Sequence, residues 1–219
     1  MKYRQKQDNF LYSIFSELEF VGKYSMPKIS ATTNANILNL ITFNYAKTCQ
    51  MPEYYHLCFY IDDYQFERLW NEPQKYIDLL KSFKGLIGAD FSMYRDFPVM
   101  LNIYNCWRSK VLMAFWQKLG IEVIPNVTWS DEASYKWCFD GLPQNSIVAV
   151  STNGCLKDSV AKQLFIAGFN EMKRRLNPLK IVVVGSLPKE LQEEKNIIHF
   201  NAYTSLFGMK EKSLTFKGG

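Results

Sequence analysis

Two stretches decide the fold, Ser146-Ile147-Val148-Ala149-Val150-Ser151 and Lys180-Ile181-Val182-Val183-Val184. Both are short, apolar and rich in β-branched residues, which predicts strands that are covered on both faces. Between them, residues 158–176 have helical spacing and open on Asp158, a residue type that favours helix N-termini. A strand, a helix and a second strand at this spacing predict a parallel βαβ unit.

The same alternation continues on both sides of this unit. We expect strands over residues 27–31, 37–43, 55–61, 85–91, 121–127 and 197–200, and helices over 62–83, 98–119, 132–139 and 188–194. This count predicts an α/β fold in which repeated βα units form a small or incomplete (β/α) barrel. An open doubly wound parallel sheet is the alternative. The chain is expected to be one domain, with an N-terminal extension over 1–26, a core over 27–204 and an irregular tail over 205–219.

Composition points to a reducing compartment. The five cysteines are odd in number and widely spaced, which fits a cytoplasmic location better than a disulfide framework. With only two histidines, a zinc site is not expected, whereas carboxylates leave Mg²⁺ possible. No apolar run is long enough to cross a membrane, so no membrane partner is expected. Neither the oligomeric state nor the cofactor follows from the sequence.

The net charge of +5 is unevenly distributed along the chain. Residues 1–152 carry fifteen basic and fifteen acidic side chains, whereas residues 153–219 carry eleven basic and six acidic ones. Lys173, Arg174, Arg175 and Lys180 lie close together in this last third. Such a patch could contact phosphates of nucleic acid, or it could be a solvated helix end.

Small polar and acidic residues gather where four consecutive predicted strands end. Parallel strands place their carboxyl ends at one edge, where ligands bind in α/β folds. The candidate ligand-binding residues there are Asp62, Asp63, Ser92, Tyr94, Arg95, Trp129, Ser151, Thr152, Asn153 and Gly154, together with Arg108 on the following helix.

Asp90 and Asp131 are the candidate catalytic residues. Asp90 ends the run Gly85-Leu86-Ile87-Gly88-Ala89, where a carboxylate would be partly desolvated and would need a partner such as Arg95 or Arg108. It is a candidate general base, metal ligand or ribose contact, or else a residue that fixes its loop. Asp131 favours the N-terminus of a helix, but it would pair with Asp90 if the two ended neighbouring strands.

The turn Ser151-Thr152-Asn153-Gly154 lies between a strand and a helix, a setting that favours phosphate binding as well as any tight turn. No Walker A sequence, GxGxxG or GxSxG occurs. No cysteine lies near a histidine in a recognisable nucleophile context, so triad-type hydrolysis is not expected.

Several motifs, in order, resemble one family. They are His56-Leu57-Cys58-Phe59-Tyr60-Ile61-Asp62-Asp63-Tyr64-Gln65-Phe66-Glu67, Asp90-Phe91-Ser92-Met93-Tyr94-Arg95-Asp96-Phe97-Pro98, Asn105-Cys106-Trp107-Arg108, Val123-Ile124-Pro125-Asn126-Val127-Thr128-Trp129-Ser130-Asp131 and Ser151-Thr152-Asn153-Gly154-Cys155. The chain is similar to domain-of-unknown-function family 4417, which occurs in phages, plasmids and integrative elements of bacteria. The resemblance implies a setting of mobile DNA but no activity. Because the family pattern favours a hydroxyl residue where this chain has Asn126, no role is expected for that side chain.

Three functions remain open at this point. The first is an enzyme acting on a nucleotide or nucleic acid through an acidic and phosphate-binding site at the strand ends. The second is a non-catalytic binder that sequesters a nucleotide or inhibits a host protein. The third is a DNA-binding accessory protein that uses the basic last third, and steep salt dependence would identify it.

Overall fold

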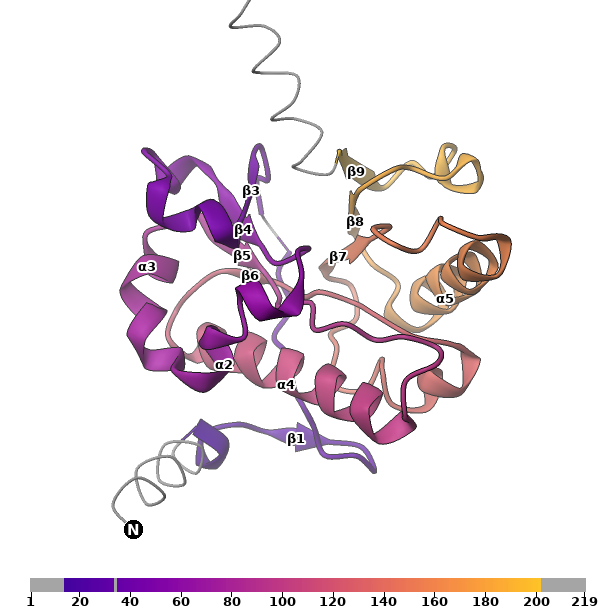
Figure 1. Ribbon diagram of the computed structural model, residues 1–219, viewed down its shortest axis with the longest axis horizontal. Coiled ribbons are helices and arrows are strands. Elements are labelled where there is room, and N and C mark those ends of the chain that lie inside the picture. Colours follow the sequence, from indigo (N-terminus) through magenta and orange to yellow (C-terminus); the bar gives the residue numbers. More distant parts are fainter. Residues whose placement is uncertain (1–13, 34, 202–219) are drawn as a thin grey trace, which may run out of the picture.

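The computed structural model describes residues 14–33 and 35–201, so the tail expected over 205–219 lies outside the described residues. Figure 1 shows parallel strands alternating with helices along the chain. One parallel sheet has the order β3 (Leu40–Thr42), β4 (His56–Cys58), β5 (Gly85–Ile87), β6 (Val123–Ile124). The other has the order β7 (Ile147–Ser151), β8 (Lys180–Val184), β9 (Ile197–Phe200). These sheets confirm the predicted α/β class.

Two of the predicted helices are confirmed as long helices, whereas the one expected over 62–83 is broken and those expected over 132–139 and 188–194 are short 3-10 turns. The long helices are α4 (Val99–Lys118) and α5 (Ser159–Leu176). Residues 62–83 break into α2 (Arg68–Asn71), α3 (Ile77–Lys81) and the 3-10 turns η3 (Asp63–Gln65) and η4 (Pro73–Tyr76). Three further 3-10 turns, η2 (Pro52–Tyr54), η5 (Glu132–Lys136) and η6 (Lys189–Leu191), and a longer one, η1 (Phe43–Thr48), complete these connections. Asp158 caps α5, because its carboxylate accepts the backbone N–H of Ala161 at 2.7 Å.

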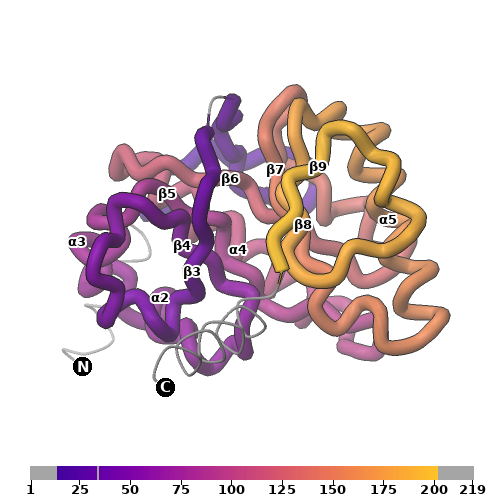
Figure 2. Tube along the Cα trace, turned by 90° about the horizontal axis from the view of Figure 1, so that it is seen from above, coloured from indigo at the N-terminus to yellow at the C-terminus, as the bar shows by residue number. Residues whose placement is uncertain are grey.

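A closed barrel is not confirmed. The two sheets are joined by one isolated bridge, between Asn126 and Ala149, and no pairing of β3 with β9 occurs among the described residues. Viewed from above, the β3–β6 half and the β7–β9 half lie side by side (Figure 2). The four-stranded parallel sheet fits the open sheet of the alternative, although within each sheet the strand order follows the chain order without the reversal of a doubly wound sheet.

Apolar residues pack on both faces of the strands. A large core of buried side chains lies between the strands and the helices, and includes Phe59, Trp116 and Phe169. A smaller buried cluster takes residues from six of the parallel strands: Leu40, Cys58, Ile87, Ile124, Ile147, Ala149, Val182 and Val184. The partly buried Ile198 and Phe200 of β9 pack against it. Burial on both faces explains why the strand sequences are continuously apolar.

The prediction of a parallel strand over residues 27–31 is wrong. Residues Met26–Pro27 form β2, which pairs antiparallel with β1 (Phe20–Val21) instead of joining a parallel sheet. This hairpin packs against α4, where the indole N–H of Trp107 donates to the carbonyl of Ser25 at 3.1 Å. No helix in the described part of the chain is both long and apolar enough to cross a membrane.

Helix α4 is buried along much of its length and carries a buried cation. Lys110 is 2% exposed. Its ammonium donates to the backbone carbonyls of Cys138 at 2.9 Å and Asp140 at 2.7 Å, with Trp137 farther away at 3.5 Å. These bonds fix the segment that follows η5 against α4, since a buried ammonium requires compensating acceptors.

Candidate functional site

A pocket of about 370 Å³ lies at the carboxyl ends of β5, β6 and β7. Its walls come from the loop after β5, the loop after β6, and the turn from β7 into the first turns of α5. The lining residues are Asp90, Ser92, Met93, Tyr94, Arg95, Asp96, Val127, Thr128, Trp129, Ser130, Ser151, Asn153, Gly154, Cys155, Lys157, Asp158, Ala161, Leu164 and Phe165. The pocket therefore spans the seam between the two sheets.

The structure brings many of the candidate residues together here. Asp90, Ser92, Tyr94, Arg95, Trp129, Ser151, Asn153 and Gly154 line the pocket. The other candidates, Asp62, Asp63, Arg108, Thr152 and Asp131, are not among its lining residues. Thr152 is buried and donates its hydroxyl to the carbonyl of Ser186 at 2.9 Å, which ties the β7 turn to the β8 turn. Asp62 is exposed at the start of η3.

Asp90 is a partly buried carboxylic acid at the end of β5, and no cation pairs with it among the described residues. Its Oδ1 accepts one hydrogen bond, from the amide of Asn126 at 2.8 Å. The pKa of Asp90 is raised to about 7: desolvation raises it most, the Asn126 hydrogen bond lowers it, and the charge of Asp63 raises it. At neutral pH this acid is therefore poised to accept or donate a proton.

Asp63 and Arg108 shape the loop that carries Asp90 toward the pocket. The Asp63 carboxylate accepts the hydroxyl of Ser92 at 2.8 Å and its backbone N–H at 3.1 Å. The Arg108 guanidinium lies 3.5 Å from the centre of the Phe91 ring and donates to Glu67 at 2.6 Å. Both residues thus brace the β5 loop from behind.

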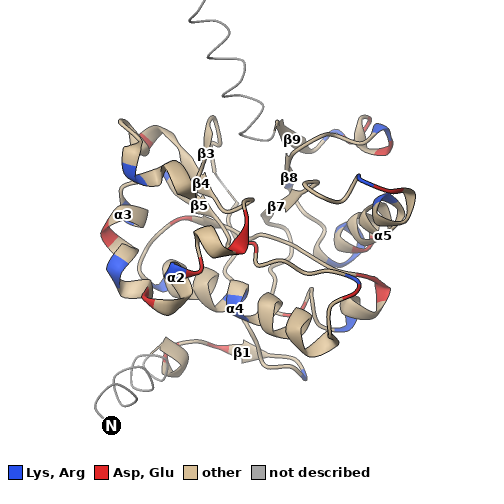
Figure 3. Cartoon of the chain, in the orientation of Figure 1, with Lys and Arg blue, Asp and Glu red and all other residues tan. Residues whose placement is uncertain are grey.

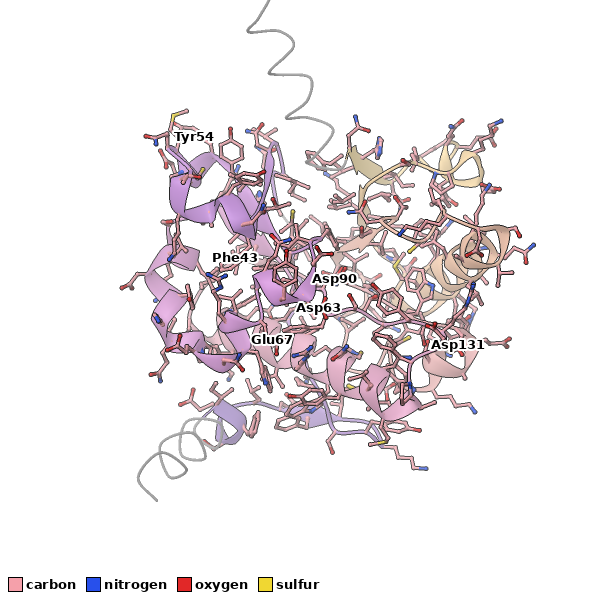
Figure 4. The ribbon with its side chains drawn as sticks, in the orientation of Figure 1. Phe43, Tyr54, Asp63, Glu67, Asp90 and Asp131 are labelled. Atoms are coloured by element: carbon pink, nitrogen blue, oxygen red, sulfur yellow. The ribbon has the colours of Figure 1, made fainter. Side chains whose placement is uncertain are left out.

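Asp131 caps a helix and does not pair with Asp90. Its side chain accepts the backbone N–H of Ser134 at 3.1 Å, which satisfies the first turn of η5. Figure 4 shows Asp90 beside Asp63 near the middle of the molecule, with Asp131 well apart at its side. The structure therefore does not bring together the carboxylate pair that the sequence left open.

Trp129 forms a flat wall of the pocket. Its indole N–H donates to the carbonyl of Leu164 at 3.1 Å, and its ring stacks on Phe165 at 5.6 Å between centroids. A Cβ at Gly168 would overlap three adjacent atoms of the indole at nearly equal distances, so Gly168 lies over a face of the ring. The indole is partly exposed and lines the pocket. This fixed ring suits stacking against a planar ligand.

We expect Gly168→Ala to disturb this wall. Alanine normally favours a helix interior by about 1 kcal/mol over glycine, but here its methyl group would collide with the indole of Trp129. Urea unfolding should therefore show a net loss of about 1–3 kcal/mol, accompanied by a change in the tryptophan fluorescence of the folded protein. Ala167→Gly, at an exposed neighbouring position of α5, is the control and should lose only about 1 kcal/mol. A stabilised Gly168→Ala protein would show that the indole is not held against α5.

Cations lie at the pocket beside exposed acids. Arg95 pairs with Asp158 at 3.5 Å across the pocket, with both side chains well exposed, and Lys157 is exposed beside them. Gly154 has a φ of 77°, and a side chain there would meet only open space. The turn before α5 is therefore accessible as well as tightly curved.

Sequence reasoning missed Lys157, Cys155 and Asn126. Lys157 is not part of any recognised motif. Asn126 was given no role because the family pattern favours a hydroxyl residue at that position. Burial and the charge of Asp90 raise the pKa of the Cys155 thiol to about 11, which disfavours the thiolate. Among the described residues, no group of three or more His, Cys, Asp or Glu side chains could hold a metal ion.

The basic patch is largely paired within the molecule. Arg174 and Arg175 both bind Glu171, at 2.7 Å and 2.6 Å, and Lys173 pairs with Glu194. Basic and acidic segments are likewise interspersed on α2 and α3 (Figure 3). The three helix-end cations are thus engaged by carboxylates, which weakens the interpretation of this patch as a phosphate contact.

Comparison with known proteins identifies the family. Residues 18–203 match the domain of unknown function DUF4417, and the chain belongs to that family. The chain is 31% identical to the Gene 1 protein of Mycobacterium phage D29 over 159 residues, which cover 73% of this chain and 58% of the relative. It is 36% identical to the Gene 1 protein of Mycobacterium phage L5 over 131 residues, covering 60% and 57%. The matched region thus spans less than two thirds of each relative. No solved structure matches.

Proposed function

We propose that this member of the DUF4417 family is an enzyme that acts on a nucleotide or a nucleic-acid strand, with Asp90 as its acid/base group. The observation that carries the proposal is the unpaired, desolvated carboxyl group of Asp90 at a pocket wall. Burial raises the pKa of this group to about 7, so both protonation states are populated near neutrality. A buried acid without a cation partner reduces stability, and a functional role accounts for its presence.

The pocket's other walls support a ligand that combines a planar ring with an anionic group. The fixed indole of Trp129 provides a stacking surface for a base. Arg95 and Lys157 provide cations for phosphate at the opening of α5. Partial protonation of Asp90 lowers the repulsion that a full carboxylate would exert on that phosphate.

Asp90 would exchange a proton with the bound ligand. The hydroxyl groups of Ser92 and Ser151 at the pocket wall donate to Asp63 and to the carbonyl of Val184, so they would serve a ligand as acceptors. A binder that sequesters the nucleotide without changing it would use the same stacking and phosphate contacts. The two functions differ in whether the ligand is chemically converted.

The binding half of the proposal is tested by thermal shift at about pH 7, with nucleoside mono- and triphosphates and short oligonucleotides as probes. A ligand at about 100 times its Kd should stabilise the protein by about 2.7 kcal/mol. The double variant Arg95→Ala and Lys157→Ala should lose most of this shift, since it removes the cations of the pocket. Lys118→Ala, at an exposed lysine of α4 outside the pocket lining, is the matched control and should keep the shift. Absence of a shift with every probe, or an equal shift in the double variant, would contradict nucleotide binding here.

A further inference from the structure

The side chain of Asn126 lies at the seam between the two sheets, directly behind Asp90. Its backbone makes the bridge to Ala149, and the residue is 4% exposed. The side-chain amide makes three hydrogen bonds. Nδ2 donates to Oδ1 of Asp90 at 2.8 Å and to the carbonyl of Ala89 at 3.3 Å, and Oδ1 accepts the hydroxyl of Tyr60 at 2.8 Å.

These partners determine which way the amide points. The carbonyl of Ala89 can only accept, so the NH₂ group of Asn126 must face it. The amide oxygen then faces Tyr60, whose hydroxyl donates to it. Burial raises the pKa of Tyr60 well above its ordinary value, and the charges of Asp90 and Cys58 act in the same direction. The hydroxyl therefore keeps the proton that this bond requires.

The orientation of the amide in turn distinguishes the two oxygens of Asp90. Oδ1 receives an N–H and must act as an acceptor, so a proton on the neutral acid belongs on Oδ2. No donor reaches Oδ2 within the part of the chain that the structure describes. Oδ2 is not among the fully buried polar atoms that lack a partner there, which are His56 Nδ1, Trp116 Nε1 and Tyr135 OH. It therefore reaches solvent, and the pocket that Asp90 lines provides the access.

We infer that Asn126, anchored by Tyr60 and Ala89, is the positioning residue of this site: it reserves Oδ1 of Asp90 as an acceptor and leaves Oδ2 as the atom that exchanges a proton with the ligand. The catalytic meaning of this assignment rests on the proposed function. The orientation itself is a property of the free protein. It assigns a role to a side chain for which the family resemblance implied none.

The inference is tested by a carbon-13 NMR titration of the Asp90 carboxyl group without ligand, with the signal assigned by its loss in Asp90→Asn. Asn126→Leu keeps the volume but removes the donor, so the pKa of Asp90 should rise by about one pH unit, because a hydrogen bond to the charged form is lost. Tyr60→Phe removes one hydroxyl group and should raise this pKa by less, since the amide keeps its bond to Ala89.

Two controls separate positioning from general destabilisation. Ile124→Ala truncates a fully buried residue of β6, two positions before Asn126, in the smaller apolar cluster. It should lower stability while leaving the pKa of Asp90 unchanged. Tyr94→Phe removes an exposed hydroxyl group from the pocket wall and should also leave it unchanged. If Asn126→Leu does not fold, the comparison of Tyr60→Phe with Tyr94→Phe decides the question.

An Asp90 pKa that does not move in Asn126→Leu or Tyr60→Phe, or that moves equally in Ile124→Ala, would overturn the inference. Because the titration needs no ligand, its outcome is independent of nucleotide binding. A shifted pKa in a protein that binds no nucleotide would keep the positioning role and reject the proposed function.

Discussion

Replacing Asp90 by Asn is expected to stabilise the folded protein at about pH 8, by roughly 2–4 kcal/mol, while abolishing the chemistry of the pocket. The native state raises the pKa of Asp90 to about 7 from an ordinary value of 3.8. Each pKa unit corresponds to about 1.4 kcal/mol of difference between the protonation states. The asparagine is neutral at every pH and retains an oxygen for the Asn126 amide.

The gain should depend on pH in a defined direction. Because the folded-state pKa is raised, the folded chain holds a proton that the unfolded chain releases as pH rises from about 4 to about 7. The wild type loses stability over this range, and Asp90→Asn does not. Urea unfolding of both proteins at about pH 4 and about pH 8 should therefore show a small difference at the lower pH and a large one at the higher pH.

Asp63→Asn provides the matched comparison, because the Asp63 carboxylate accepts two hydrogen bonds from Ser92 and lies near Arg108. Its replacement should destabilise the protein at about pH 8 by roughly 1–3 kcal/mol. Equal losses for Asp63→Asn and Asp90→Asn would show that Asp90 is an ordinary loop-fixing residue.

The second large effect is expected at Lys110. Lys110→Met preserves the length of the side chain but leaves the carbonyls of Cys138 and Asp140 without their donor. Buried carbonyls without partners are costly, so we expect a loss of about 2–4 kcal/mol in urea unfolding. For a chain of this size, each kcal/mol lowers Tm by about 2–4 °C.

Lys118→Met is the control for Lys110→Met, since Lys118 is an exposed lysine at the end of the same helix. Its effect should stay within about 0.5 kcal/mol. If both lysine variants lost the same small amount, the ammonium of Lys110 would not be holding the segment after η5, and that segment would owe its place to apolar contacts of Trp137 and Phe139.

Local patterns in the sequence predicted the repeating units because each strand and helix carries its own signal. The apolar run of β7, the capping Asp158 and the run of β8 identify one βαβ unit without reference to the rest of the chain. Barrel closure depends instead on which distant strands pair, and no local pattern records that Asn126, just after β6, makes a single bridge to β7. The β1–β2 hairpin was missed for the same reason, since its position depends on contacts with α4.

The part of the candidate site that lies after strand ends could be predicted from the sequence. Asp90, Arg95, Trp129 and the β7 turn follow strands directly, and parallel pairing brings them to one pocket. Asp63 comes after β4 and Arg108 lies within α4, but both side chains bind the β5 loop from behind, which only the tertiary contacts reveal. The buried positions of α4 could not be predicted from the sequence either, because the buried polar residues Asn105, Arg108 and Lys110 interrupt the apolar periodicity of the helix.

Product analysis tests directly whether Asp90 is the acid/base group. The wild type and Asp90→Asn are each incubated with the nucleotide or oligonucleotide that gives the thermal shift, and the mixture is separated by chromatography. We predict that the wild type converts the ligand, with a rate that depends on a group titrating near pH 7, and that Asp90→Asn binds it without converting it. An unchanged ligand after incubation with the wild type, or equal conversion by Asp90→Asn, would contradict the role of Asp90 as the acid/base group.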